Sequence, residues 1–233
     1  MRVLHLINAL GRGGAEVLLT EGLGVADRDR FTYSYAYLLS KPDNLAANLR
    51  AQGARVDCLH LNGILSRLLG ACRVARYLRK HEVDVVHAHL PVAGIVARLA
   101  GKLAGVPVVY TEHCPIESYH PLVRRLGLLT WQWQERIIAI SDDVADSIRT
   151  NAGEAIPVQT VWNGVDTERF APLQEDGRAV RSDLGIPSRA PVIGTVAVFR
   201  DTPQKRLDVW LETAQKVRTE VPGTHFVLVG DGS

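Results

Sequence analysis

The chain has 233 residues, of which 46% are hydrophobic and 22% charged, and its formal net charge is +2. This is the composition of an ordinary globular protein, and so small a net charge gives no reason to expect a nucleic acid partner. Three cysteines without a C-x-x-C spacing argue against a disulfide framework and a zinc site, and they suit a reducing cytoplasm, which is the location we expect.

Short apolar runs alternate with amphipathic stretches through most of the chain. Near-continuous apolar strands predict a parallel sheet covered on both faces, and the alternation predicts a doubly wound, Rossmann-like α/β domain. The strands are expected at 3–7, 32–38, 55–58, 83–87, 106–111, 136–140 and 158–161, and the helices at 15–26, 44–51, 65–81, 93–104, 121–134 and 142–149.

The rest of the chain predicts a second, smaller unit. Residues 173–190 are polar and interrupted by proline and glycine, which indicates a linker with one short helix at 176–184. A strand at 192–199, a helix at 205–219 and a strand at 224–229 follow. We therefore expect a first domain at 1–172 and a second at 191–233, and the second is too short to bury a core of its own.

A glycine pair follows the first predicted strand. Gly13 and Gly14 precede a helix, where backbone N–H groups can approach an anion such as phosphate closely. A plain tight turn is the alternative. Glu16 occupies the last glycine position of the dinucleotide fingerprint, which disfavours a nucleotide-linked oxidoreductase, and no Lys-Ser/Thr follows to make a P-loop.

A second candidate anion site lies at 200–206. Thr202 can cap the predicted helix, which places Lys205 in its first turn beside Arg206, with Arg200 on the preceding turn. Cations at a helix N-terminus oppose the helix dipole, so their presence predicts a bound anion, with phosphate the obvious one. A solvated basic helix start that binds nothing is the alternative.

Polar side chains gather at the ends of two further strands. His87 and His89 end the fourth strand, and Glu112 and His113 end the fifth. The carboxyl ends of parallel strands are where such sheets bind ligands. A metal site is disfavoured because these groups come from separate strands, and His113 is the stronger functional candidate.

The segment 120–133 is basic, apolar and rich in tryptophan. A core helix is the commoner explanation of such a segment. An alternative is contact with an anionic membrane surface through Arg124 and Arg125.

Taken together, these motifs resemble those of the GT-B glycosyltransferases of sequence family 4, group 1, whose members retain anomeric configuration. No single motif is decisive, but their order and spacing are specific. They are Gly13–Glu16, Asp84–His89, Thr111–His113, Asn163–Asp166 with Arg169–Pro172, Arg200 with Lys205, and Gly230–Gly232.

The resemblance implies two Rossmann-like domains, the first holding an acceptor and the second a nucleotide-sugar donor. It implies that Gly13 and Gly14 approach the donor diphosphate and that His113 contacts the donor sugar. Arg200 and Lys205 would bind the donor and stabilise the leaving diphosphate in place of a metal, so no metal or other cofactor is expected. The product would be a glycosylated hydroxyl on a saccharide or a lipid-linked acceptor, made at the inner face of the membrane if Arg124 and Arg125 meet one.

The family's Glu-x7-Glu motif, further into the donor domain, does not occur before the chain ends. We therefore expect a truncated form that is inactive by itself. A non-catalytic acceptor- or lipid-binding module, or one half of a split enzyme, is the alternative function.

Overall fold

The computed structural model describes residues 1–40, 45–61, 70–171, 174–197, 199 and 205–230. The chain forms two compact units, Met1–Gly164 and Val165–Ser233, each considered by itself. This division falls before residue 172, where the sequence predicts the first domain to end.

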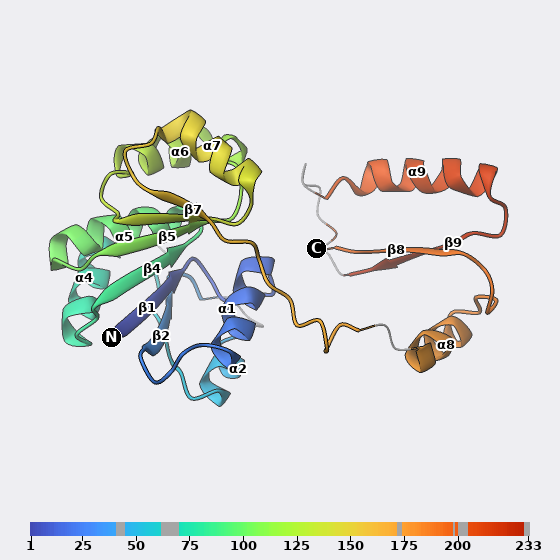
Figure 1. Ribbon diagram of the computed structural model, residues 1–233, viewed down its shortest axis with the longest axis horizontal. Helices are drawn as coiled ribbons and strands as arrows, with labels where there is room; N and C mark the ends of the chain where they lie inside the picture. Colours follow the sequence, from blue (N-terminus) through green and yellow to red (C-terminus); the bar gives the residue numbers. More distant parts are fainter. Residues whose placement is uncertain (41–44, 62–69, 172–173, 198, 200–204, 231–233) are drawn as a thin grey trace. The chain divides into compact units, whose positions relative to one another are not determined.

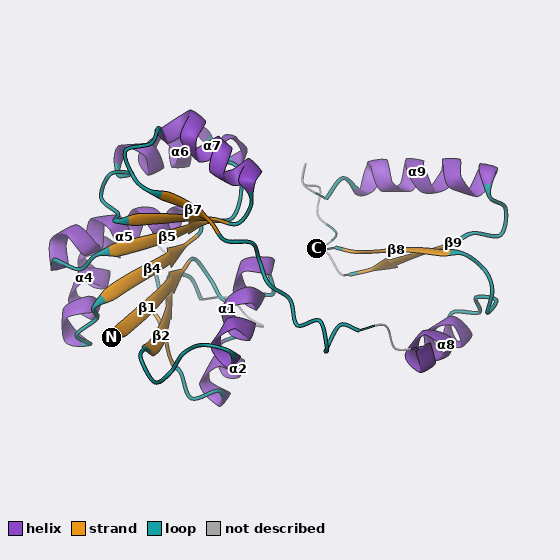
Figure 2. Ribbon diagram, in the orientation of Figure 1, coloured by secondary structure: helices purple, strands orange, loops and turns teal. Residues whose placement is uncertain are grey.

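The first unit is built on a seven-stranded sheet with the order β3-β2-β1-β4-β5-β6-β7, in which every neighbouring pair is parallel (Figures 1 and 2). The order turns back at β1, as in a doubly wound fold, and confirms the predicted parallel sheet. The strands are β1 Arg2–Ile7, β2 Thr32–Tyr37, β3 Arg55–Cys58, β4 Val85–His89, β5 Val108–Glu112, β6 Arg136–Ala139 and β7 Val158–Thr160.

Helices cover both faces of this sheet. The described ones are α1 Gly14–Gly24, α2 Ala46–Ala51, α4 Gly70–Lys80, α5 Pro91–Ala104, α6 Pro121–Leu129 and α7 Asp142–Ala152, with a short 3-10 helix, η1, at Ile116–Ser118. No helix of the described residues is long and apolar enough to cross a membrane.

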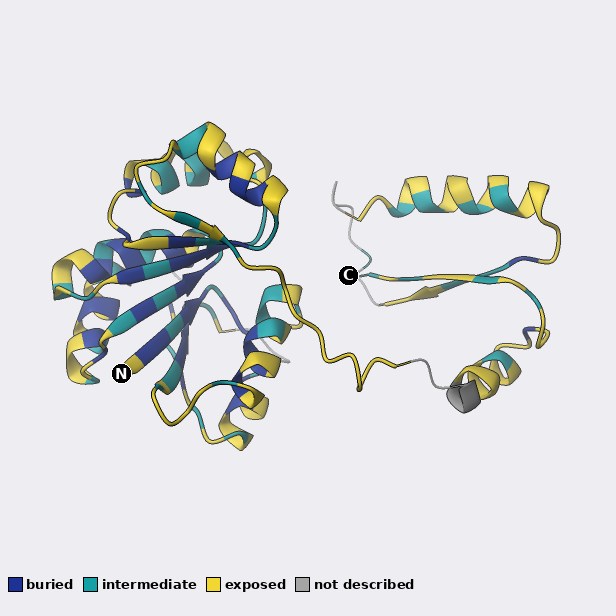
Figure 3. Ribbon diagram, viewed as in Figure 1, coloured by how far each residue is buried: buried dark blue, intermediate teal, exposed yellow. Residues whose placement is uncertain are grey.

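Side chains alternate between the two faces along each strand, so each face has its own core. Figure 3 shows buried residues along the strands of this sheet. Leu4, Leu6 and Tyr110 belong to the larger core, which also contains residues of α4, α5 and α7. Ile7 and Tyr35 belong to a smaller core with residues of α1 and α2. We call these the α5 face and the α1 face.

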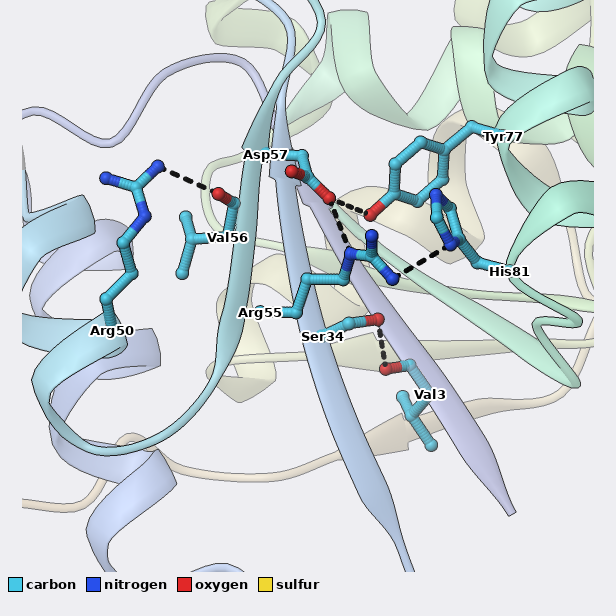
Figure 4. Close-up of polar contacts among 8 residues, drawn as sticks. All are labelled: Val3, Ser34, Arg50, Arg55, Val56, Asp57, Tyr77 and His81. Carbon is cyan, nitrogen blue, oxygen red and sulfur yellow. Dashed lines mark hydrogen bonds and ion pairs between the residues drawn. The ribbon is translucent and has the colours of Figure 1, made fainter.

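The edge strand β3 is held to α4 by a polar network (Figure 4). Tyr77 of α4 donates a 2.6 Å hydrogen bond to Asp57, which also accepts one of 3.0 Å from Arg55. A second guanidinium nitrogen of Arg55 lies 2.9 Å from Nδ1 of His81. Asp57 of β3 is thus bonded to Tyr77 of α4, and Arg55 of β3 to His81, the residue that follows α4.

Two predicted boundaries in the first unit are wrong for identifiable reasons. The helix predicted at 121–134 ends at Leu129, because the side chains of Thr130 and Gln134 are bonded to Arg98 of α5, at 3.0 and 2.9 Å. Strand β4 runs on to His89 instead of ending at residue 87, because His89 lies opposite Thr111 in the parallel ladder with β5.

The second unit contains α8 Gln174–Asp183, β8 Val192–Val196, α9 Leu207–Glu220 and β9 His225–Val229, with β8 and β9 parallel. None of the residues of α9 is buried, and Val196 of β8 is 79% exposed. The described part of this unit therefore buries little apolar surface.

The predicted start of its long helix is also wrong. Helix α9 begins at Leu207, and Arg206 precedes it in the left-handed region with φ of 39°. The guanidinium of Arg206 pairs with Asp208 at 3.0 Å, and that carboxylate lies in the first turn, where the helix dipole favours it. Lys205 therefore lies before the helix and not in its first turn. Thr202, the predicted cap, lies outside the described residues.

Candidate functional site

Four histidines meet on the α1 face of the sheet. His5 lies in β1, His87 and His89 lie in β4, and His113 directly follows β5. Strand β4 lies between β1 and β5, and His5 pairs in register with His87. Because residues two apart in a strand share a face, the sheet itself brings these imidazoles together.

The histidines line a cavity of about 470 Å³ within the first unit. Helix α1 contributes an apolar wall, with Ala15, Leu18 and Leu19 among its residues. The segment after β7 contributes Trp162, Asn163 and Gly164. The cavity thus combines apolar surface with a few grouped polar side chains, which is typical of a small-molecule site.

Specific contacts order the four rings. Nδ1 of His5 lies 3.1 Å from Nε2 of His89, and Nδ1 of His89 lies 3.3 Å from Nε2 of His113. His87 is held differently, because its Nε2 lies 2.7 Å from the hydroxyl of Thr111. Three of the histidines therefore form a chain, and the fourth is bonded to β5.

The rings are neutral at pH 7. Burial lowers the pKa of His87 and of His113 to about 4. Burial, with repulsion between neighbouring imidazoles, lowers the pKa of His5 and of His89 well below the usual 6.5. A neutral imidazole has one donor and one acceptor nitrogen, so the cluster offers hydrogen bonds and no fixed charge.

Ring nitrogens of His5, His87 and His89 all lie within 4.8 Å of one another, close enough for a metal ion to be considered. Two of these nitrogens already face each other as a hydrogen-bonded pair. The arrangement is that of hydrogen-bonded imidazoles, and the prediction that the protein needs no metal stays a prediction.

Glu112 supports His113 from the opposite face. Its carboxylate accepts a 3.0 Å hydrogen bond from the backbone N–H of His113, a 3.1 Å bond from Tyr110 and a short bond from Tyr119. Burial raises the pKa of Glu112 to about 7, although these hydrogen bonds lower it. The sequence pointed to Glu112 as a polar group at a strand end and as a possible metal ligand, but not as the residue that supports His113. Its position as the one acid ending an apolar strand was the available signal.

The predicted phosphate loop lies beside the cavity but does not line it. Gly13 is the N-cap of α1 and Gly14 is its first residue, while the neighbouring Ala15 lines the cavity. A Cβ atom on Gly13 would collide with the carboxylate of Glu16, so this acid folds back over the helix start. An anion binding at that N-terminus would have to displace it.

The remaining predicted residues lie elsewhere. Lys205 belongs to the second unit and is exposed, and Arg200 lies outside the described residues. Arg124 and Arg125 lie on α6, beside α5, where they line a groove of about 570 Å³. Arg124 also donates a short hydrogen bond to Asn151 of α7.

The fold and the cavity define the class of protein: an α/β protein with a Rossmann-like parallel-sheet unit and a second, smaller α/β unit, a class that includes the GT-B glycosyltransferases. The chain belongs to glycosyltransferase family 4, since the model of that family, Glycosyltransferase Family 4, matches residues 1–169. The predicted family and fold class are therefore confirmed.

Two relatives illustrate the similarity. The chain is 31% identical over 202 residues to UDP-Gal:alpha-D-GlcNAc-diphosphoundecaprenol alpha-1,3-galactosyltransferase of Escherichia coli, covering 82% of this chain and 51% of that protein. It is 25% identical to the putative glycosyltransferase EpsF of Bacillus subtilis (strain 168), covering 99% of this chain and 62% of that one. The chain thus spans about half to three-fifths of the length of these relatives.

A solved structure has the same fold. Anabaena Alr3699/HepE in complex with UDP and glucose aligns with a TM-score of 0.82 at 22% identity, covering all of this chain and 62% of that one.

Proposed function

We propose that the complete protein is a retaining glycosyltransferase that moves a sugar from a nucleotide-sugar to an acceptor hydroxyl. One observation carries most of the proposal. His113, the residue expected to contact the donor sugar, lies in a cavity at the end of β5 with its main chain and its ring both hydrogen-bonded. A fixed, neutral imidazole suits hydrogen bonding to a sugar hydroxyl.

The donor we propose is a UDP-sugar. The name of the Escherichia coli relative specifies UDP-Gal, and that protein is similar to 82% of this chain. Gly13 and Gly14 at the start of α1 would approach the diphosphate, with Glu16 moving aside. Arg200 and Lys205 would stabilise the charge that develops on the leaving diphosphate.

Lys205→Ala in the complete protein tests the enzymatic proposal. If Lys205 acts on the leaving group, turnover of UDP-galactose and UDP-glucose should fall by the factor that corresponds to a loss of about 2–4 kcal/mol of transition-state stabilisation. Lys216→Ala is the matched control, because it removes an exposed lysine from α9 of the same unit. Equal turnover in both folded variants would contradict the role of Lys205. The anomeric configuration of the product, read by NMR, tests retention.

The acceptor we propose is lipid-linked and is met at an anionic membrane. Helix α6 exposes three leucines beside Arg124 and Arg125: Leu122 at 59%, Leu126 at 43% and Leu129 at 68%. Apolar side chains flanked by arginines can insert at the headgroup boundary while the cations meet anionic lipid. The diphosphoundecaprenol acceptor in the name of the Escherichia coli relative agrees with such a location.

Vesicle binding tests this surface. Replacing Arg124 and Arg125 together by serine should weaken binding to phosphatidylglycerol-containing vesicles at low salt, by about 1 kcal/mol per arginine. The control replaces Arg73 and Arg76, exposed arginines of α4, and makes the same change in net charge. If both double variants bind alike, α6 is not the membrane contact.

A binding module without catalysis remains the second candidate, because the described part of the second unit buries little apolar surface. The complete protein would then bind an acceptor or lipid but release no UDP from any UDP-sugar in the presence of lipid-linked acceptor. Restoration of release by a second chain would indicate a split enzyme.

A further inference from the structure

Three histidines of the cavity, His5, His89 and His113, meet nitrogen to nitrogen. A five-membered ring with C–N bonds of about 1.33 Å has its nitrogens about 1.13 Å from its centre. Two imidazoles whose nitrogens are 3.1 Å apart can therefore have their centres at most about 5.4 Å apart, when each nitrogen points straight at the other. The rings of His5 and His89 are 5.3 Å apart, which is nearly that limit.

The second contact has the same geometry. The nitrogens joining His89 to His113 are 3.3 Å apart and the ring centres 5.6 Å, again the separation of a head-on pair. Both contacts are consequently near-linear N–H···N hydrogen bonds, the preferred angle for such bonds. In each pair the two nitrogens point at each other and not at a common point beside the line that joins them, which is the geometry of a hydrogen bond and not of shared metal ligation.

Counting donors fixes how the protons are arranged. Each neutral imidazole carries one N–H, and each N···N contact needs one proton between its two nitrogens. If Nδ1 of His5 carries the proton, Nε2 of His89 accepts, so Nδ1 of His89 donates and Nε2 of His113 accepts. Starting from a protonated Nε2 on His113 reverses every bond. All three rings must therefore be the same tautomer.

We propose that His5 and His89 are positioning residues that set the tautomer of His113 through this chain. The three rings change tautomer together. When Nε2 of His5 is an acceptor, Nδ1 of His113 is a donor, and when Nε2 of His5 is a donor, Nδ1 of His113 is an acceptor. The consequence for catalysis rests on the proposed function: His113 would present one defined hydrogen-bonding group to the sugar. His87 does not belong to this series of hydrogen-bonded histidines, because its Nε2 lies against Thr111.

The tautomers can be read directly by imidazole ¹⁵N NMR on the complete protein labelled at histidine, at pH 7. We expect His5, His89 and His113 to show one common tautomer, either all Nδ1–H or all Nε2–H. Any mixture among the three would overturn the proposal. This measurement needs no substitution and no substrate, so it stands whether or not sugar transfer is found.

Two variants then test the coupling. His89→Phe should release His113, whose two nitrogens would move toward the averaged shifts of an unconstrained neutral imidazole. His87→Phe is the matched control, since the ring of His87 lies 4.3 Å from that of His89 but outside the chain, and it should leave the His113 signals in place. An unchanged His113 tautomer in folded His89→Phe protein would refute the positioning role.

His5→Phe tests the end of the histidine series that lies farthest from His113. The replacement keeps a ring against Tyr33 and Tyr35 but removes the nitrogen that meets His89, without touching His113. If UDP-sugar transfer occurs, this variant should lower kcat by up to about 100-fold with KM nearly unchanged, because a misoriented group acts on the chemical step. A changed KM with normal kcat would mean that His5 serves binding only. Absent transfer in the wild type would count against the proposed function and leave the tautomer result intact.

Discussion

The stability of the first unit should fall when the pH is lowered from 7 to 5, because its histidines are buried in the neutral form. His87 and His113 have pKa values of about 4 in the folded protein against the ordinary 6.5. Between these values the unfolded chain binds more protons than the folded one, so the stability rises with pH. Each of these two histidines is expected to cost about 2 kcal/mol of unfolding free energy on going from pH 7 to 5.

Glu112 acts in the opposite direction. Its pKa is raised from the ordinary 4.5 to about 7, so the folded state binds the proton more tightly than the unfolded state in that window. Acidification to pH 5 should therefore stabilise the fold through Glu112 by about 2 kcal/mol, which offsets one of the two histidines. His5 and His89, whose pKa values are also lowered, add to the net loss.

Glu112→Gln separates these contributions. The amide resembles the protonated acid that predominates at pH 5, and it cannot titrate, so the offset disappears. The loss between pH 7 and 5 should grow by about 2 kcal/mol over that of the unsubstituted protein. Urea unfolding followed by tryptophan fluorescence in a Trp210→Phe background measures it, because Trp131, Trp133 and Trp162 all belong to the first unit. Equal pH dependence with and without Glu112 would refute the reasoning.

Three substitutions test the packing of the same unit by urea unfolding at pH 7. Arg98→Met should cost about 2–3 kcal/mol, because it removes the hydrogen bonds to Thr130 and Gln134 and leaves the buried side-chain oxygen of Gln134 unpaired. Gly101→Ala should cost about 1–3 kcal/mol, because its Cβ would lie 2.6 Å from the backbone oxygen of Val106. Gly22→Ala has open space in α1 and should stabilise the protein by about 0.5–1 kcal/mol. A loss at Gly22 like that at Gly101 would mean that helix propensity does not decide the outcome there.

Periodicity was enough to predict the strands of the first unit. Each of them forms, because short segments centred on apolar residues alternate with longer amphipathic helices. The boundaries that failed depend on tertiary partners. Helix α6 stops where Arg98, from a helix more than 20 residues earlier, bonds to Thr130. No local pattern contains that information.

The site was predictable only in part, for a similar reason. His113 stood out because it ends an apolar strand, but His5 was overlooked although it is the one polar side chain within Val3–Ile7. The available signal was its place in the strand. Residues two apart share a face, so His5 lies on the same face as Val3 and Ile7, which is the α1 face that also carries His87 and His89. The strand order β1-β4-β5 then decides which histidines meet, and that order is a property of the whole sheet.

The two faces of β5 support His113 in different ways, and this separates the effects of their variants. Glu112 lies toward the α5 face, where it accepts the backbone N–H of His113, while His89 holds the ring of His113 on the α1 face. The amide of Glu112→Gln can still accept that N–H at every pH, so this variant should keep the His113 tautomer while it changes the pH dependence of stability. His89→Phe should change the tautomer. If Glu112 and His89 lay on the same face of β5, the charge of Glu112 and the hydrogen bond with His89 would both act on the ring of His113, and the two variants would not separate the pH dependence of stability from the tautomer.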